Sequence, residues 1–229
     1  MSDRPGRSSG ALTRHDLGGP ALVVARSLLG SLLTSTVGGH EVTVCITEVE
    51  AYGAQDDPGS HAFRGRSERN AVMFGEAGHL YVYRHLGLHH CLNVATGPAG
   101  SASAVLLRAG EVIVGAEVAR GRREARGVVR ADVDLARGPA RLAVALGIDA
   151  TMNGVDLLDP HGALRLGPGV PTGEIAWGPR VGVSGDGGRG DLFPWRLWVA
   201  GEPTVSAYRR APARPRRTRG SGTPSGTAH

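Results

Sequence analysis

The chain has 229 residues, of which 41% are hydrophobic and 21% charged, and this composition excludes a mainly disordered or collagen-like chain. All 26 basic residues are arginines, which excludes chemistry that depends on a lysine amine and phosphate loops built around a lysine. The net charge of +5 comes from residues 209–229, which carry six arginines and no acid, because residues 1–208 carry 20 arginines and 21 acids.

One domain is expected at 12–208, between a disordered N-terminus (1–11) and a disordered, arginine-rich tail (209–229), because both ends are polar and rich in Gly, Ser or Pro. The positive charge of the tail could attract nucleic acid or anionic lipid; the alternative is a solvated extension that binds neither. Two cysteines make no disulfide framework, and no signal peptide or membrane span is evident. We therefore expect a cytoplasmic protein without membrane contact.

Taken in chain order, the first expected element is a helix at 20–29, since Pro20 suits its first position and Gly30 its end. Two strands follow, at 32–37 and 40–52, and the Gly-Gly pair between them predicts a hairpin.

The middle of the chain starts with residues 53–75, which lack periodicity and are expected to form a long loop. Short strands are expected next, at 80–84, 88–95 and 104–109. Helices are predicted at 111–125 and 139–146, and the chain after 150 returns to strands separated by Gly-containing turns. These elements predict an α+β fold: a single domain with a curved, mostly antiparallel sheet, flanking helices and a protruding hairpin.

Two carboxylates end the strand at 40–52. Alternation places the following side chains on one face: Val42, Val44, Ile46, Glu48, Glu50 and Tyr52. Carboxylates on an apolar face are costly unless they are solvated or catalytic, and a close pair can supply a general base. The alternative is a strand end with both glutamates in water, and without other signals it is the favoured interpretation.

Aromatic and imidazole side chains gather between residues 79 and 91. Tyr81 and Tyr83 share a strand face and would either stack on a planar base or fill the core. The histidine cluster comprises His79, His85, His89 and His90, beside Cys91. A metal-dependent hydrolase is a less favoured alternative, because no His-Glu-x-x-His or Cys-x-x-Cys spacing is present, and no metal is predicted.

A series of motifs in chain order resembles the alkyladenine (3-methyladenine) DNA glycosylase family. The motifs are ALVVARSLLG at 21–30, TEVEAY at 47–52, RNAVMF at 69–74, GHLYVY at 78–83, CLNV at 91–94, VLLRA at 105–109, GPARL at 138–142 and RVGV at 180–183. The resemblance covers roughly residues 20–205.

The resemblance implies a monofunctional enzyme of base excision repair that acts as a monomer, without metal or organic cofactor. It would bind damaged double-stranded DNA, flip an alkylated purine of the 3-methyladenine type, or hypoxanthine or ethenoadenine, out of the duplex and hydrolyse its N-glycosidic bond without lyase activity. A DNA-binding module that has lost catalysis is the alternative from another class.

The resemblance also assigns residues by position. Glu50 would be the general base, with Arg108 and the main chain of Val181 positioning the water. The base pocket would contain Tyr52, His61, Tyr83 and Asn93, with Asn93 at its floor rejecting guanine. DNA contacts would come from Leu86, Tyr81, Arg69, Asn70, Met73 and Gly182. Leu86 stands where the family usually has an intercalating tyrosine, so a leucine wedge that stacks less well on bases is expected.

Overall fold

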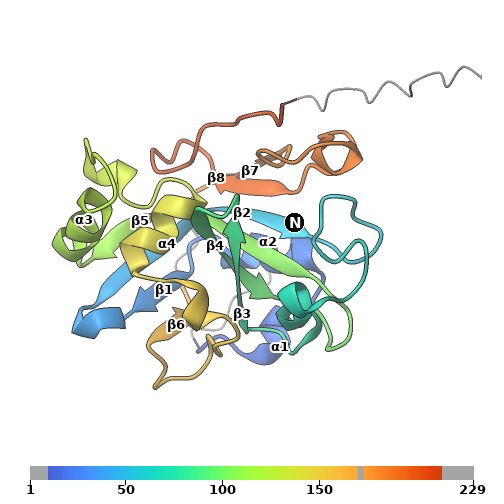
Figure 1. The fold of residues 1–229 in the computed structure, drawn as a ribbon, viewed down its shortest axis with the longest axis horizontal. Helices are drawn as coiled ribbons and strands as arrows, with labels where there is room; N and C mark the ends of the chain where they lie inside the picture. The colour runs from blue at the N-terminus through green and yellow to red at the C-terminus, as the bar shows by residue number, and fades with distance from the viewer. Residues whose placement is uncertain (1–9, 170–172, 213–229) are drawn as a thin grey trace, which may run out of the picture.

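The computed structural model describes residues 10–169 and 173–212 (Figure 1). The disorder expected for the two ends falls largely on residues 1–9 and 213–229, which lie outside the described residues. Of the tail predicted at 209–229, residues 209–212 are described, and the carbonyl of Arg209 accepts a hydrogen bond from the N–H of Gly182.

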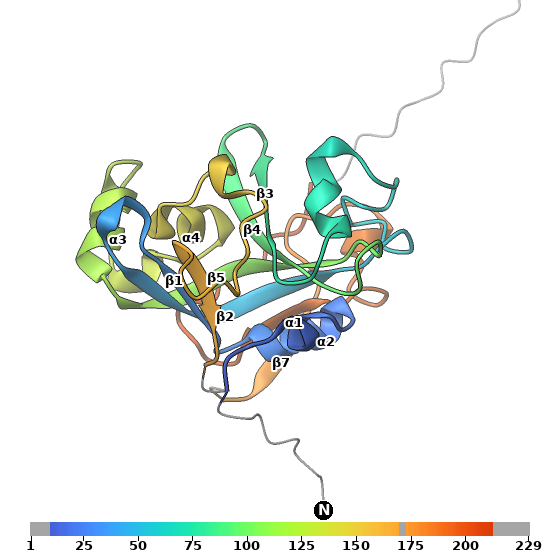
Figure 2. The ribbon, with the colours of Figure 1, turned by 90° about the horizontal axis from the view of Figure 1, so that it is seen from below.

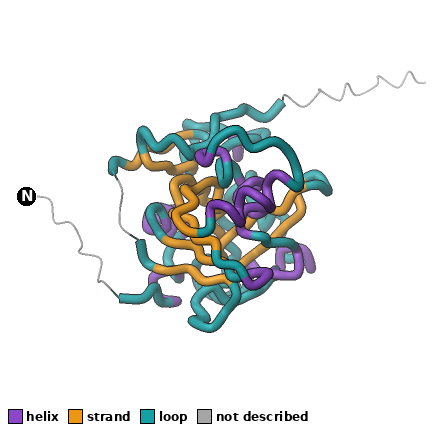
Figure 3. The backbone as a smooth tube through the Cα atoms, turned by 90° about the vertical axis from the view of Figure 1, so that its left-hand side faces the viewer, coloured by secondary structure: helices purple, strands orange, loops and turns teal. Residues whose placement is uncertain are grey.

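The described strands form one antiparallel sheet. They are β1 (Leu32–Ser35), β2 (Val42–Tyr52), β3 (Leu80–His85), β4 (His89–Ala95), β5 (Ala104–Val114), β6 (Leu164–Gly167), β7 (Ile175–Gly178) and β8 (Arg196–Val199). The order is β3-β4-β5-β2-β1-β6, and β8 pairs with the end of β2 and carries β7 on its far edge. In the side view of Figure 3 the strands run through the middle of the molecule.

Helices cover the sheet on both sides (Figure 2). They are α1 (Arg14–Leu17), α2 (Ala21–Leu28), α3 (Ala116–Glu124) and α4 (Pro139–Leu146), with short 3-10 segments η1 (Val37–Gly39), η2 (Glu68–Phe74), η3 (Asp132–Asp134), η4 (Ala150–Met152) and η5 (Asp186–Gly188). Figure 2 shows α1 and α2 on one side of the sheet, and α3, α4 and the β3–β4 hairpin on the other. The hairpin pairs with β5 only at its base, so its tip protrudes.

The predicted fold class is confirmed, and most elements lie where local signals placed them. Pro20 is the N-cap of α2, and Gly147 ends α4 in the left-handed conformation. The Gly-Gly pair closes the β1–β2 turn, with β1 and β2 in antiparallel register. Within the described residues, no helix is long and apolar enough to cross a bilayer.

Two predicted elements are wrong in part. The helix predicted at 111–125 begins only at Ala116, because residues up to Val114 continue β5 against β2. Gly115 makes the break: its φ is 74°, and a Cβ there would lie 2.1 Å from the carbonyl oxygen of Glu41. The loop predicted at 53–75 contains η2, whose capping box joins Ser67 and Asn70.

Candidate active site

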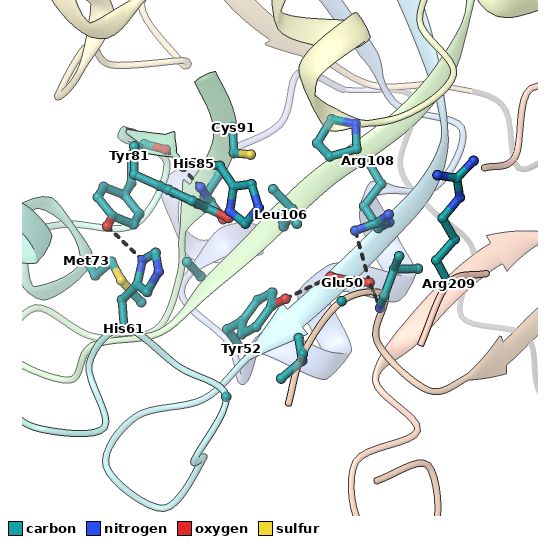
Figure 4. A pocket seen from close by; sticks show the side chains of 18 residues that line it. Glu50, Tyr52, His61, Met73, Tyr81, His85, Cys91, Leu106, Arg108 and Arg209 are labelled. Atoms are coloured by element: carbon teal, nitrogen blue, oxygen red, sulfur yellow. Dashed lines mark hydrogen bonds and ion pairs between the residues drawn. The ribbon is translucent and has the colours of Figure 1, made fainter. Parts of the chain in front are cut away.

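A cavity of about 450 Å³ opens on the α4 side of the sheet, next to the β3–β4 hairpin (Figure 4). Its volume lies in the range typical of small-ligand sites. Residues from several strands and loops line it. They include Glu50 and Tyr52 of β2, Tyr81 and Tyr83 of β3, Asn93 of β4, Leu106 and Arg108 of β5, and His61, Val181 and Gly182 from loops. The fold thus brings together residues as far apart in the sequence as Glu50 and Arg209.

Glu50 is fully buried from bulk solvent, yet it lines this cavity. Its Oε1 accepts a hydrogen bond of 2.7 Å from the backbone N–H of Val181 and lies 3.1 Å from Nη1 of Arg108. Its Oε2 accepts a hydrogen bond of 2.8 Å from the hydroxyl of Tyr52 (Figure 4). Three donors therefore fix the carboxylate in one orientation toward the cavity.

Arg108 reaches Glu50 from an irregular part of the sheet. Glu48 pairs with Ala109 and Val49 pairs with Leu107, so Arg108 has no partner in the register between β2 and β5. Bulges of this kind redirect side chains and are frequent beside active sites. Although burial opposes its charge, Glu50 and Glu48 raise the pKa of Arg108 further above its ordinary value, so it is always cationic.

Glu48 is also fully buried, but its oxygens are occupied by structural partners. Its Oε1 accepts hydrogen bonds from Arg108 at 2.8 Å, from Arg196 at 2.6 Å and from the Ser206 hydroxyl at 2.9 Å, while Oε2 accepts one from the Ser206 N–H at 2.7 Å. Burial alone would raise the pKa of Glu48, but Arg108 and Arg196 lower it below its ordinary value. Of the two carboxylates predicted on this strand, only Glu50 lines the cavity.

A second ion pair holds the loops around the cavity. Arg180 and Asp57 are both fully buried and form a bidentate pair, with N–O distances of 2.6 and 2.7 Å. The Arg180 guanidinium also donates to the carbonyls of Ala51 and Gly187, and its Cζ lies 4.6 Å from the centre of the Tyr52 ring. One face of that ring is therefore covered by a cation.

The opposite wall of the cavity is aromatic. The rings of His61 and Tyr83 meet edge to face with centroids 4.5 Å apart, and the hydroxyl of Tyr81 lies 3.0 Å from Nδ1 of His61. Burial, and then Arg69 and His85, lower the pKa of His61 from 6.5 to about 4. His61 is therefore neutral at pH 7.

The tyrosines of the cavity are neutral as well. Burial raises the pKa of Tyr83 far above its ordinary value, and the neighbouring Cys91 thiol contributes to the same shift. Desolvation, and then the carboxylate of Glu50, raise the pKa of Tyr52, so its phenol keeps its proton and donates to Glu50. Asn93 is buried on β4 and donates from Nδ2 to the Tyr81 carbonyl at 3.0 Å.

Some of the residues expected to contact DNA are buried in this structure. Asn70 is 3% exposed; it accepts from the Ser67 N–H and donates to the carbonyls of His61 and Gly65. Met73 is also buried and lines the cavity. Asn70 holds the loop that carries His61 by hydrogen bonding, and Met73 packs against Ala62 of the same loop.

The other expected contact residues differ in their exposure. Arg69 is exposed, with its Cζ 5.8 Å from the centre of the Tyr83 ring, whereas Tyr81 is 1% exposed. Gly182 lines the cavity and donates its N–H to the carbonyl of Arg209 at 3.0 Å. Arg209 itself reaches the cavity (Figure 4), although the sequence assigns it to the tail.

Leu86 lies at the tip of the protruding hairpin and is 80% exposed. The N–H of Leu88 donates to the carbonyl of His85, and the turn gives Leu86 a φ of 50°. A left-handed conformation costs a leucine about 1–2 kcal/mol. The fold thus holds an apolar side chain in water on a strained turn, at the position expected for a wedge.

Several residues of the site were not predicted: Asp57, Arg196, Ser206 and Arg209. An aspartate in a glycine-rich loop and arginines near the end of the chain give no local signal, because their partners are distant in sequence. The predicted histidine cluster does not converge, since within 10–169 and 173–212 no three His, Cys, Asp or Glu side chains are placed to hold a metal ion.

Comparison with known proteins identifies the family of the chain. Residues 15–203 match the family described as methylpurine-DNA glycosylase (MPG). A protein of Streptomyces avermitilis named "Putative 3-methyladenine DNA glycosylase" is 51% identical over 210 residues, which cover 90% of this chain and 96% of its own length. Proteins of the same name from Nocardia farcinica (83% and 88% covered) and Leifsonia xyli (84% and 90% covered) are 52% and 53% identical. The chain therefore belongs to the methylpurine-DNA glycosylase family of DNA-repair hydrolases.

Proposed function

We propose that this protein is a monofunctional DNA glycosylase that hydrolyses the N-glycosidic bond of a flipped, alkylated purine with a water molecule activated by Glu50. The observation that carries the proposal is the environment of Glu50: a buried carboxylate that lines a ligand-sized cavity and is held by Val181, Arg108 and Tyr52. A carboxylate oriented beside the reacting sugar is the group that this hydrolysis needs.

The chemistry assigned to Glu50 has two parts. As the base departs, the sugar develops oxocarbenium character, which a nearby carboxylate stabilises. Glu50 also accepts a proton from the attacking water, for which the carbonyl of Val181 is the second acceptor in our assignment. Arg108 holds the orientation of Glu50, because its Nη1 lies 3.1 Å from the carboxylate Oε1.

The aromatic walls would select the base. Tyr52 presents its free face from one side, since Arg180 covers the other, and His61 and Tyr83 lie across the cavity. Electron-rich, neutral rings attract a cationic alkylpurine by cation–π interaction, which an undamaged base lacks. The Asn93 amide is fixed by Tyr81, so the exocyclic amine of guanine would meet a rigid side chain.

Duplex DNA would approach from the side of the β3–β4 hairpin. Leu86 is the exposed apolar residue at its tip and would fill the gap left by the flipped nucleotide. The chain has no lysine to form an imine with the sugar, so the product would be an intact abasic site.

The test is single-turnover base release from alkylated duplex DNA by wild type, by Glu50→Gln and by Glu117→Gln, an exposed glutamate of α3 that serves as the control. Loss of a general base lowers the rate by about 10²–10⁴-fold, while the control should match wild type. Borohydride should trap no covalent DNA adduct. Equal rates for Glu50→Gln and wild type would overturn the assignment of the base, and a trapped adduct would overturn the monofunctional reaction.

A further inference from the structure

A second cavity, of about 350 Å³, lies between α3, α4 and the start of β4. Its polar lining consists of Arg123, Arg126, Arg141, His89 and His90, and no acidic residue is among the described residues that line it. Pro139 lines the first cavity and the next residue, Ala140, lines the second, so the two meet the same end of α4. Figure 2 shows α3, α4 and the hairpin on one side of the sheet.

Arg123 is the unusual member of this group. Its side chain belongs to α3 and is 8% exposed, and its Nε is buried without a hydrogen-bond partner within the described part of the chain. Burial, and then the charge of Arg141, lower the pKa of Arg123, whereas Asp134 acts in the opposite direction. A buried guanidinium with an unsatisfied donor is costly, unless a ligand completes its hydrogen bonds.

The charge around Arg123 is not balanced by the protein. Arg141 contacts Asp134 at 3.1 Å, but that carboxylate also faces Arg137 at 3.9 Å. Arg126 is exposed at the end of α3. Asp149 is a second nearby acid: hydrogen bonds from Thr151, and then the charges of His90 and Arg126, lower its pKa. Three guanidinium groups therefore surround the cavity with two acids beside them, and this excess of positive charge favours an anion as the occupant.

The chemistry of the donors selects a phosphate group. Planar guanidinium groups bind phosphate oxygens with paired hydrogen bonds, and arginine is the side chain best suited to this geometry. The first turn of α4, an eight-residue helix, adds the positive end of its dipole next to Ala140. Leu88 and His89 bring the cavity to the base of the hairpin tip that carries Leu86.

We propose that this second cavity binds one phosphodiester group of the DNA backbone beside the flipped nucleotide, through Arg123, Arg126 and Arg141. The proposal rests on the proposed function in taking duplex DNA as the substrate. It gives the hairpin a fixed anchor, because a phosphate held at the base of the tip sets the register in which Leu86 meets the base stack.

The experiment neutralises DNA phosphates one at a time. Duplexes with a single lesion carry one methylphosphonate at successive positions, and binding is measured in the Glu50→Gln background so that the substrate stays intact. One position should weaken binding by about 10-fold, the size expected for a charge-assisted hydrogen-bond site. Arg141→Gln should abolish that sensitivity and lower the slope of log K against log salt by about 0.9.

Control variants distinguish phosphate binding at this cavity from a nonspecific effect of the protein's positive charge. Arg120→Gln removes one charge from the same helix α3, where Arg120 is paired with Glu124 and Asp132, and it should keep both the sensitive position and the salt slope. Arg126→Gln is a second exposed variant, in case Arg141→Gln perturbs α4, and Arg123→Met tests the buried donor after its thermal unfolding has been recorded.

Each outcome decides the proposal. The proposal is supported if one methylphosphonate position weakens binding by Arg120→Gln as it does in wild type, but no longer weakens binding by Arg141→Gln, Arg126→Gln or Arg123→Met. Identical methylphosphonate profiles in all variants overturn it. This holds even if inorganic phosphate raises the Tm of wild type but not of the arginine variants, because the cavity would then bind free phosphate and not DNA. Base release is measured separately with the enzyme that retains Glu50. If the proposed reaction fails, the binding result can therefore still be interpreted by itself.

Discussion

Arg180 connects the two groups that orient Glu50, and its replacement therefore tests the architecture of the site. It directly precedes Val181, whose N–H donates to Glu50, and its guanidinium covers the ring of Tyr52, whose hydroxyl donates to the other oxygen of Glu50. Arg180→Gln keeps a hydrogen-bonding side chain but removes the charge and the paired contacts to Asp57.

The expected loss follows from burial. Arg180 and Asp57 are both fully buried, and Gln would leave the Asp57 carboxylate without a countercharge. Breaking such a pair costs about 3–5 kcal/mol, and each kcal/mol lowers the Tm of a domain of this size by about 2–4 °C. The Tm should therefore fall by roughly 6–20 °C. Excision should also slow by about 10²-fold at a temperature where the variant is folded, because a shift of about 1 Å in a catalytic group has that effect.

Calorimetric unfolding and single-turnover excision measure the two effects. Arg189→Gln is the matched control, since Arg189 is exposed and pairs with Asp186 and Asp191 on the surface, where such pairs contribute about 0–1 kcal/mol. The double variant Asp57→Asn/Arg180→Gln should lose less stability than the sum of the single variants. A Tm for Arg180→Gln equal to that of Arg189→Gln would refute this reasoning.

Three further predictions address charge and the wedge. Because its pKa is lowered, Glu48 contributes stability that is complete above the unfolded value of about 4.5 and is lost as the pH falls through the lower folded value. Glu48→Gln should therefore lower the Tm at pH 7. In a series of Tm measurements at different pH, the variant should also show a smaller fall in Tm between about pH 5 and pH 3 than wild type does. A fall equal to that of wild type would contradict this prediction. His61 has a pKa of about 4, so its NMR signals should remain those of the neutral ring down to about pH 5, and a midpoint near 6.5 contradicts the assignment. A leucine lacks the aromatic stacking that is worth about 1–3 kcal/mol per base. In single-turnover excision, Leu86→Tyr should therefore reduce the preference for hypoxanthine opposite T over hypoxanthine opposite C, and Leu86→Gly should increase it. The same ratio in wild type and both variants would show that Leu86 is not the wedge.

Local signals predicted the elements that depend on neighbouring residues. The Gly-Gly turn, Pro20 and the Pro139–Gly147 pair all act within a few residues, and each marks an element that the structure contains. The error at 111–125 had a local cause as well: Val112, Ile113 and Val114 are β-branched and extend β5, whereas helical periodicity starts only after Gly115.

Contacts across the sequence could not be predicted in the same way. The alternation on β2 correctly placed Glu48 and Glu50 on one side, since both contact Arg108, but it could not separate their roles. The difference comes from Arg196 and Ser206, about 150 residues away, which occupy Glu48 and leave Glu50 to the cavity. Gly59 is another such case: a Cβ there would lie 2.5 Å from Nη2 of Arg180, a clash visible only once the loops meet.

The two buried ionic clusters have a common explanation in what they hold. Replacing buried ion pairs with apolar residues is often neutral or stabilising, so stability alone does not account for Glu48 with Arg108 and Arg196, or for Asp57 with Arg180. Both clusters end at Glu50. The first reaches it directly through Arg108, and the second through Val181 and Tyr52. Glu48 and Asp57 engage these arginines with hydrogen bonds and ion pairs, so the guanidinium groups are held in place, and Glu50 remains oriented at the wall of the cavity. A carboxylate held in this way is what the proposed base-excision reaction needs.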